Sequence, residues 1–196
     1  NLKVLRHKGK SHGVKETRGK YSKGKSIRKR DKSVYSREEA GHWEADTVVS
    51  GQGKSKACFA TLAERKTRFY IAMKMSDRRA ETMENAIVAA LSAFPPQLVK
   101  TITCDRGTEF ANWRRIEERL HCEVYFADPY CAWQKGTNEN LNGLLREFYP
   151  KGRNLSRVAP ATLKRNLALL NARPRKVLYF HSAQELWDFE LNSCCT

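Results

Sequence analysis

Long hydrophobic runs are missing from this 196-residue sequence: every apolar stretch is shorter than the roughly 20 residues that a membrane-spanning helix needs. A signal-peptide pattern is missing as well. The six cysteines include no Cys-x-x-Cys pair, and His121 and Cys122 have no second pair of ligands at zinc-site spacing. We therefore expect neither a membrane protein, nor a disulfide framework, nor a zinc finger, but reduced cysteines in the cytosol.

Acidic residues are scarce relative to basic ones. The chain holds 37 Lys and Arg against 21 Asp and Glu, a formal net charge of +16, and residues 1–40 alone hold 14 basic and 4 acidic residues. This excess predicts an acidic partner, with nucleic acid the first candidate. Because residues 1–40 also lack apolar periodicity, we expect an extended basic arm, which either contacts phosphates or is a solvated linker.

The spacing of apolar residues alternates between strand-like and helix-like along residues 41–150. Alternation and short apolar runs predict five strands, at residues 42–49, 56–64, 67–75, 98–104 and 122–127. Helical spacing predicts helices at residues 78–93, 109–121 and 138–148. The pattern predicts an α/β core domain with a mixed sheet, followed over residues 151–196 by a helical extension with a Ser182–Glu185 capping box.

Three acidic residues occupy positions that favour metal chemistry. Asp46 lies within the first predicted strand, Asp105 at the carboxyl end of the fourth, and Glu139 on the polar side of the helix over 138–148. If the first and fourth strands are neighbours, the carboxylates approach one another, and they repel unless divalent cations are bound. Mg²⁺ prefers such oxygen ligands, and two ions can hold the attacking and leaving oxygens of a phosphodiester.

Four motifs carry a resemblance to a known family. They are GHWEADTVV at 41–49, TITCDRGTEF at 101–110, YFADPYCAWQKGTNENLNGLLR at 125–146 and LNARPRKVL at 170–178. With these motifs, and with 33 residues between Asp105 and Glu139, the sequence resembles the DDE transposases and retroviral integrases over about residues 41–190. It is most similar to the bacterial transposases of the insertion-sequence-thirty group.

This resemblance implies a ribonuclease-H-like fold, a mixed five-stranded sheet with flanking helices. It makes Asp46, Asp105 and Glu139 the catalytic, metal-binding triad, which uses Mg²⁺ or substituting Mn²⁺, two ions per site when DNA is bound. The implied reaction is strand cleavage and strand transfer at transposon ends, by a homodimer or larger assembly at the bacterial nucleoid. A hydrolytic nuclease of the same fold and a non-catalytic DNA-binding protein remain as alternatives.

Several residues depart from the family's pattern or have more than one interpretation. Arg106 stands where Asn is common, and the family's N-terminal helix-turn-helix region has no counterpart in the sequence. Glu44 either supports the metal ligands or forms a salt bridge, while His42 is expected to be a packed strand residue. The candidate DNA contacts, some of which could be merely solvated, are Lys135, Asn138, Asn142, Arg146, Arg106, Arg173 and Arg175.

Overall fold

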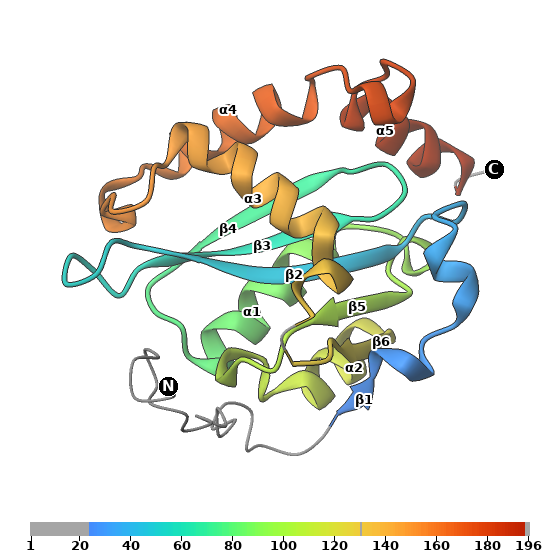
Figure 1. Ribbon diagram of the computed structural model, residues 1–196, viewed down its shortest axis with the longest axis horizontal. Helices are drawn as coiled ribbons and strands as arrows, with labels where there is room; N and C mark the ends of the chain where they lie inside the picture. The colour runs from blue at the N-terminus through green and yellow to red at the C-terminus, as the bar shows by residue number, and fades with distance from the viewer. Residues whose placement is uncertain (1–23, 130, 195–196) are drawn as a thin grey trace, which may run out of the picture.

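A mixed sheet of six strands forms the centre of the computed structural model, which describes residues 24–129 and 131–194 (Figure 1). From edge to edge the strands are β1 (Lys25–Ser26), β6 (Glu123–Phe126), β5 (Thr101–Cys104), β2 (His42–Val49), β3 (Cys58–Glu64) and β4 (Tyr70–Met75). The meander β2–β3–β4 is antiparallel, whereas β2, β5, β6 and β1 run parallel. This confirms the α/β fold class, with one strand more than the five expected.

Helices cover both faces of the sheet (Figure 1). In the described part of the chain the α-helices are α1 (Ala80–Leu91), α2 (Trp113–Leu120), α3 (Gly136–Phe148), α4 (Pro160–Asn171) and α5 (Ala183–Ser193). The helices α1 and α2 lie on one face, and α3 and α4 on the other. The last helix, α5, inserts Trp187 against Trp43 of β2, with the ring centroids 5.3 Å apart.

The strand β3 shows why the domain has an apolar core on each side of the sheet. Cys58, Ala60 and Leu62 belong to the cluster that includes side chains of α1 and α2. Phe59 and Ala63, which alternate with them, belong to the cluster formed with α3 and α4. A strand covered on both faces is apolar at nearly every position, and this explains the uninterrupted run in the sequence.

Local hydrogen bonds decide where two of the helices begin. The capping box of Ser182 and Glu185 opens α5 as predicted. The helix expected over residues 109–121 begins only at Trp113, because Asn112 leaves helical geometry and its side chain donates to Glu84 at 2.8 Å. A 3₁₀ turn, Thr108–Phe110, occupies the first part of that segment instead.

Residues 24–40 differ from the extended arm expected for residues 1–40. Their first residues form β1, which pairs in parallel with β6 and adds the sixth strand. Ile27 and Val34 are buried, at 1% and 2% exposure, and they anchor the segment on the domain. Two apolar residues seven apart are too few to create a periodic pattern, so the sequence did not reveal them. The rest of the predicted arm, residues 1–23, lies outside the described residues.

The sheet order confirms the neighbour relation on which the predicted site depends. In the parallel pair of β2 and β5, Glu44 lies beside Thr103. Asp46 and Asp105 follow two residues later along these adjacent strands. Four residues before Asp46 on β2, His42 is buried and hydrogen-bonded to Thr101 at 2.9 Å, the packed strand histidine that was expected.

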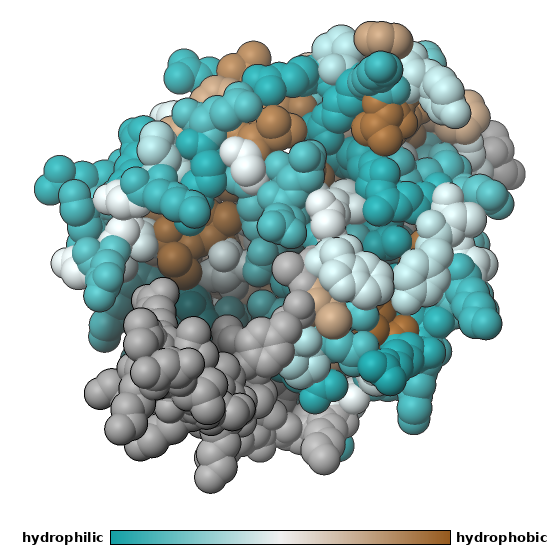
Figure 2. All heavy atoms as spheres, in the orientation of Figure 1, coloured by the Kyte–Doolittle hydropathy of each residue, from teal (hydrophilic) through white to brown (hydrophobic). Residues whose placement is uncertain are grey.

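Three of the cysteines lie in the apolar core of the domain. Cys58, Cys104 and Cys122 are buried among apolar side chains, and burial raises the pKa of Cys58 to about 11 and that of Cys122 to about 12. None of the helices in residues 24–129 and 131–194 has both the length and the hydropathy of a membrane span. The face in Figure 2 is mostly hydrophilic, with hydrophobic atoms confined to separate patches.

Candidate active site

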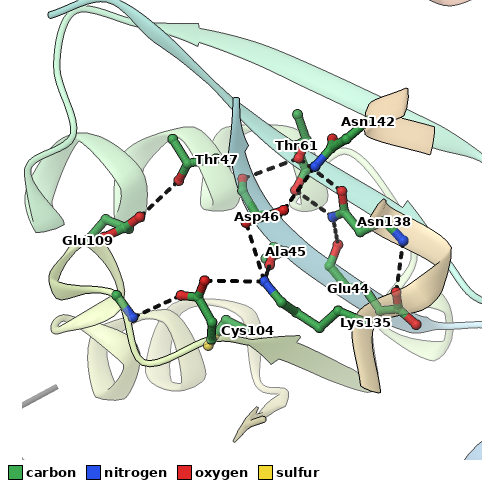
Figure 3. A network of polar contacts seen from close by, with 12 residues as sticks. Glu44, Ala45, Asp46, Thr47, Thr61, Cys104, Glu109, Lys135, Asn138 and Asn142 are labelled. Carbon is green, nitrogen blue, oxygen red and sulfur yellow. Dashed lines mark hydrogen bonds and ion pairs between the residues drawn. The ribbon is translucent and has the colours of Figure 1, made fainter. Parts of the chain in front are cut away.

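Two of the three predicted acidic ligands meet at the carboxyl end of β5. Asp46 lies on β2, and Asp105 directly follows β5. The ammonium group of Lys135 lies between them, with Nζ 3.3 Å from Asp46 Oδ1 and 3.5 Å from Asp105 Oδ2 (Figure 3). The same Nζ donates to the carbonyl of Ala45 at 3.2 Å. Two carboxylates from adjacent strands therefore share one cation.

Lys135 comes from the 3₁₀ turn Ala132–Lys135, which leads directly into α3. Its side chain is only 10% exposed. Burial lowers the pKa of the ammonium group, but the charges of Asp46 and Asp105 outweigh this effect and raise the pKa above its usual value. Lys135 was expected to contact DNA, and the structure instead places its charge inside the site, between the two aspartates.

A chain of hydrogen bonds fixes the Asp46 carboxylate from the side of α3. Asn142 Nδ2 donates to Asp46 Oδ2 at 2.9 Å, and the Tyr70 hydroxyl donates to Asn142 Oδ1 at 2.6 Å. Burial raises the pKa of Tyr70 well above its usual range, so this hydroxyl remains a donor. Asn142 was expected on a DNA-facing surface, and in the structure it donates to the Asp46 carboxylate. Tyr70 was missed altogether, because no local pattern links residues 72 positions apart.

The orienting role of Asn142 gives a testable prediction. Replacing Asn142 with Ala removes the donor to Asp46 and leaves the Tyr70 hydroxyl without its acceptor. Groups that orient metal ligands typically contribute 10–100-fold to metal affinity or activity. We expect a loss of about this size in divalent-ion affinity, measured by titration with Mn²⁺. The matched control is Asn192→Ala on the exposed side of α5, which should leave the affinity unchanged.

The first turn of α3 is fastened to the sheet by Asn138. This residue is fully buried, and its Nδ2 donates to the backbone carbonyls of Glu44 at 2.6 Å and Thr61 at 3.2 Å. The Thr61 hydroxyl in turn donates to Asn138 Oδ1 at 3.1 Å. Asn138 was predicted to contact DNA, and its burial disagrees with that prediction: a small polar residue was assigned to the surface although it joins α3 to two strands.

Glu44 connects the same helix turn to a buried arginine. Its Oε2 accepts the backbone N–H of Asn138 at 2.9 Å, and its Oε1 accepts from Arg65 Nη1. The Glu44 side chain is fully buried, and that of Arg65 is 5% exposed. Of the two roles left open for Glu44, the structure shows the salt bridge, and the same carboxylate also accepts from the helix turn that leads into Glu139.

Glu139, the third predicted ligand, lies in the first turn of α3 and is exposed. Lys135 and Asn142 lie about one turn before and one turn after it, and both contact Asp46. Glu139 therefore shares the side of α3 that faces the two aspartates. Within the described residues, however, no group of three or more His, Cys, Asp or Glu side chains is arranged to hold a metal ion. The structure brings two of the predicted ligands together and places the third predicted ligand on the adjoining helix face.

A further carboxylate, Glu109, borders the site. It is buried, accepts a hydrogen bond from Thr47 of β2 at 3.2 Å and pairs with Arg78 at 3.1 Å. Gly107 lies between this group and Asp105: a Cβ there would come within 2.4 Å of Glu109 Oε2 and 2.9 Å of Asp105 Oδ1. A side chain at position 107 would therefore displace the ends of these two carboxylates. The sequence motif contained both residues but gave no reason to single them out.

The other predicted DNA contacts are arginines spread around the domain. Arg106 and Arg146 donate to backbone carbonyls. Arg173 pairs with Glu147 at 3.1 Å, and Arg175 lies beside the first turn of α3. The side chains of these four arginines remain partly or largely exposed. Their contacts with DNA stay a prediction.

Comparison with protein families and curated proteins identifies relatives with the same sequence pattern. Residues 36–132 match the integrase core domain family. A probable transposase for the insertion-like sequence element IS1161 from Streptococcus salivarius is 37% identical over 165 residues, 84% of this chain and 46% of that protein. The transposase InsI for the element IS30C from Escherichia coli is 36% identical over 184 residues, 93% of this chain and 47% of that protein. The chain thus spans about half the length of these relatives.

Comparison with solved structures identifies the fold independently of the sequence. The crystal structure of the catalytic core domain of BIV integrase superimposes with a TM-score of 0.61. The match covers 80% of this chain and 99% of that domain, at 16% sequence identity. Integrase catalytic cores have a ribonuclease-H-like fold, so the predicted fold is confirmed at a level of identity where sequence alone carries little information.

Proposed function

The chain belongs to the integrase core domain family, together with the insertion-sequence transposases of the IS30 group, and from this premise we propose that it is the catalytic domain of a DNA transposase. Its substrates are then phosphodiester bonds of DNA at transposon ends and in target DNA. The observation that carries the proposal is the pair Asp46 and Asp105, which adjacent parallel strands hold around a single cation.

The residues of this pair fit a divalent metal ion. Integrase core domains generally use divalent metal ions, and carboxylate oxygens are the ligands that Mg²⁺ prefers. Asp46 and Asp105 already flank a cationic group, and Glu139 lies on the helix face beside them. We propose that these three residues hold Mg²⁺, or Mn²⁺ in its place, with two ions when DNA is bound. Bound ions would activate the attacking oxygen and neutralise charge on the leaving oxygen.

The protein's own groups supply position and charge. Asn142 and Tyr70 fix the orientation of the Asp46 carboxylate, while Glu44 and Asn138 fix the helix turn that presents Glu139. Preorganised ligands of this kind reduce the reorganisation needed when the scissile phosphate arrives. Lys135 supplies a positive charge that pairs with both aspartates, which the parallel strands place side by side.

A strand-joining assay tests the proposed activity. DNA ends that already carry a free 3′-hydroxyl should be joined to a target duplex in the presence of Mg²⁺ or Mn²⁺, and no joined product should form with EDTA. The reason is that strand transfer needs the metal-held phosphodiester but no earlier hydrolysis. Products are resolved on a denaturing gel.

The same assay separates the proposed function from its alternatives. Nicked DNA without joined product would indicate a hydrolytic nuclease. Binding without any metal-dependent product would indicate a non-catalytic DNA-binding protein. Because transposition cuts two ends in a coordinated way, we also propose that the active form is a homodimer or larger assembly, which light scattering on the DNA-bound protein would test.

A further inference from the structure

A cavity of about 280 Å³ opens beside the first turn of α3. Three arginines line it: Arg37 from the segment before β2, Arg68 from the turn between β3 and β4, and Arg175 from the segment between α4 and α5. The remaining described residues that line it include Thr137 and Val177 and contain no acidic side chain. Four segments that are distant in sequence therefore create one strongly positive cavity.

This cavity is separate from the carboxylate site, although both use the same helix turn. Thr137 and Leu141, which line the cavity, each lie two residues from Glu139. At about 100° per residue, that spacing places them roughly 160° from Glu139 around the helix. The arginine cavity thus extends to the side of α3 that lies away from Glu139, where Thr137 and Leu141 line it.

The positive charges in the cavity have no acidic partners among the described residues. Arg37 forms no hydrogen bond or ion pair with another described residue. The carboxylates nearest to it in charge interaction, Glu44 and Glu64, are already bonded: Glu44 to Arg65, and Glu64 to backbone N–H groups and a threonine hydroxyl. Arg37 thus has no direct ion pair in the described part of the chain, although the charges of Glu44 and Glu64 partly offset its own.

The other two arginines are held in place by neutral groups. Arg68 Nη1 donates to the Thr137 hydroxyl at 2.9 Å. Arg175 donates to two backbone carbonyls, at 2.9 and 3.3 Å, and its Nε is buried without a hydrogen-bond partner. Burial lowers the pKa of Arg37 and of Arg175, in each case reinforced by a neighbouring guanidinium group. The guanidinium groups are positioned, and within residues 24–129 and 131–194 no carboxylate forms a direct ion pair with them.

We propose that the cavity formed by Arg37, Arg68 and Arg175 binds a phosphate group of the DNA backbone while the neighbouring carboxylate site acts on the strand. Guanidinium groups bind phosphate oxygens through paired N–H donors, and a converging set of them suits a phosphodiester. The inference rests on the proposed function, because DNA is the polyanion on which the adjacent site would act. A phosphate held on the far side of the α3 turn would fix the register of DNA relative to Glu139.

The salt dependence of DNA binding tests this assignment. Each phosphate contact contributes about 0.9 to the slope of log K against log salt concentration. Arg37→Gln should therefore make the slope shallower by about 0.9 and weaken binding about tenfold at 0.1 M salt. Binding of a short duplex is measured in EDTA, where no cleavage occurs. The control is Arg165→Gln on the exposed side of α4, which removes the same charge and should leave the slope unchanged.

A second variant introduces a charge without removing any contact. Val177 lines the cavity and is 64% exposed, so Val177→Glu places a carboxylate there and should weaken DNA binding at low salt. The wild-type protein offers a further measurement, with each DNA phosphate replaced in turn by neutral methylphosphonate. At one position in the DNA, the neutral replacement should weaken binding to the wild type but should not weaken binding to Arg37→Gln.

Other outcomes would overturn either this inference or the proposed function on which it rests. If inorganic phosphate binds to the wild type but not to Arg37→Gln, while the DNA slope is the same for both, the cavity is a site for free phosphate. If the wild type and Arg37→Gln have equal salt slopes and the protein joins strands normally, the phosphate site is refuted but the transposase proposal is not. If Arg37→Gln changes the salt slope but the wild type gives no metal-dependent product, the transposase proposal is refuted and the phosphate site is retained.

Discussion

Replacing Asp46 with Asn should reduce strand cleavage and joining by about 10³-fold or more while the domain remains folded, because a lost metal contribution of several kcal/mol corresponds to that factor. Asn has the shape of Asp but no charge, so it can still accept the hydrogen bond from Asn142. It cannot attract a divalent ion in the same way. Lys135 keeps its second ion pair, with Asp105, so its charge is not left unpaired and the domain should remain folded.

Two comparisons make this expected result specific. Asp105→Asn should cause a loss of similar size, because we propose that this carboxylate, which lies beside Asp46, holds the same metal ion. Asp188→Asn makes the same chemical change on the exposed side of α5, where the carboxylate only accepts from Gln184, and should be fully active. The rates are measured with pre-cleaved ends and with intact ends. A folded Asp46→Asn variant that joins DNA at the wild-type rate would remove Asp46 from the proposed metal site.

The part of this site that could be predicted from the sequence is the part that depends on strand order and residue alternation. Alternation over residues 42–49 placed Glu44 and Asp46 on one face, and the parallel pairing of β2 with β5 brought Asp105 beside them. Both inferences use the fixed two-residue period of a strand. A regular backbone converts such a pattern directly into positions in space.

The side chains that fill the site could not be predicted in the same way. Lys135, Asn138 and Asn142 are polar residues near a helix start, and their composition alone indicated a DNA-facing surface. The structure turns each of them inward, because α3 lies across β2 and β3 and offers backbone carbonyls and carboxylates as partners. The direction of a polar side chain depends on what the helix packs against, and this packing is a property of the tertiary structure.

The largest expected effect on stability comes from Glu44. Glu44→Gln keeps the size of the side chain but removes the charge that neutralises Arg65, and it weakens the acceptor for the Asn138 backbone N–H. Breaking one partner of a buried ion pair typically costs about 3–5 kcal/mol, because the other charge remains buried without compensation. For a domain of this size, that loss should lower the midpoint of thermal unfolding by roughly 10 °C.

The matched control uses the same substitution in an exposed pair. Glu147 pairs with Arg173 at 3.1 Å, and both side chains are about half exposed, so Glu147→Gln should cost well under about 1 kcal/mol. Unfolding is followed by circular dichroism for both variants. Because Glu44 also holds the turn that presents Glu139, strand joining by Glu44→Gln should be impaired even below its unfolding transition. Equal midpoints for the two variants would mean that the Glu44–Arg65 pair does not hold α3 on the sheet.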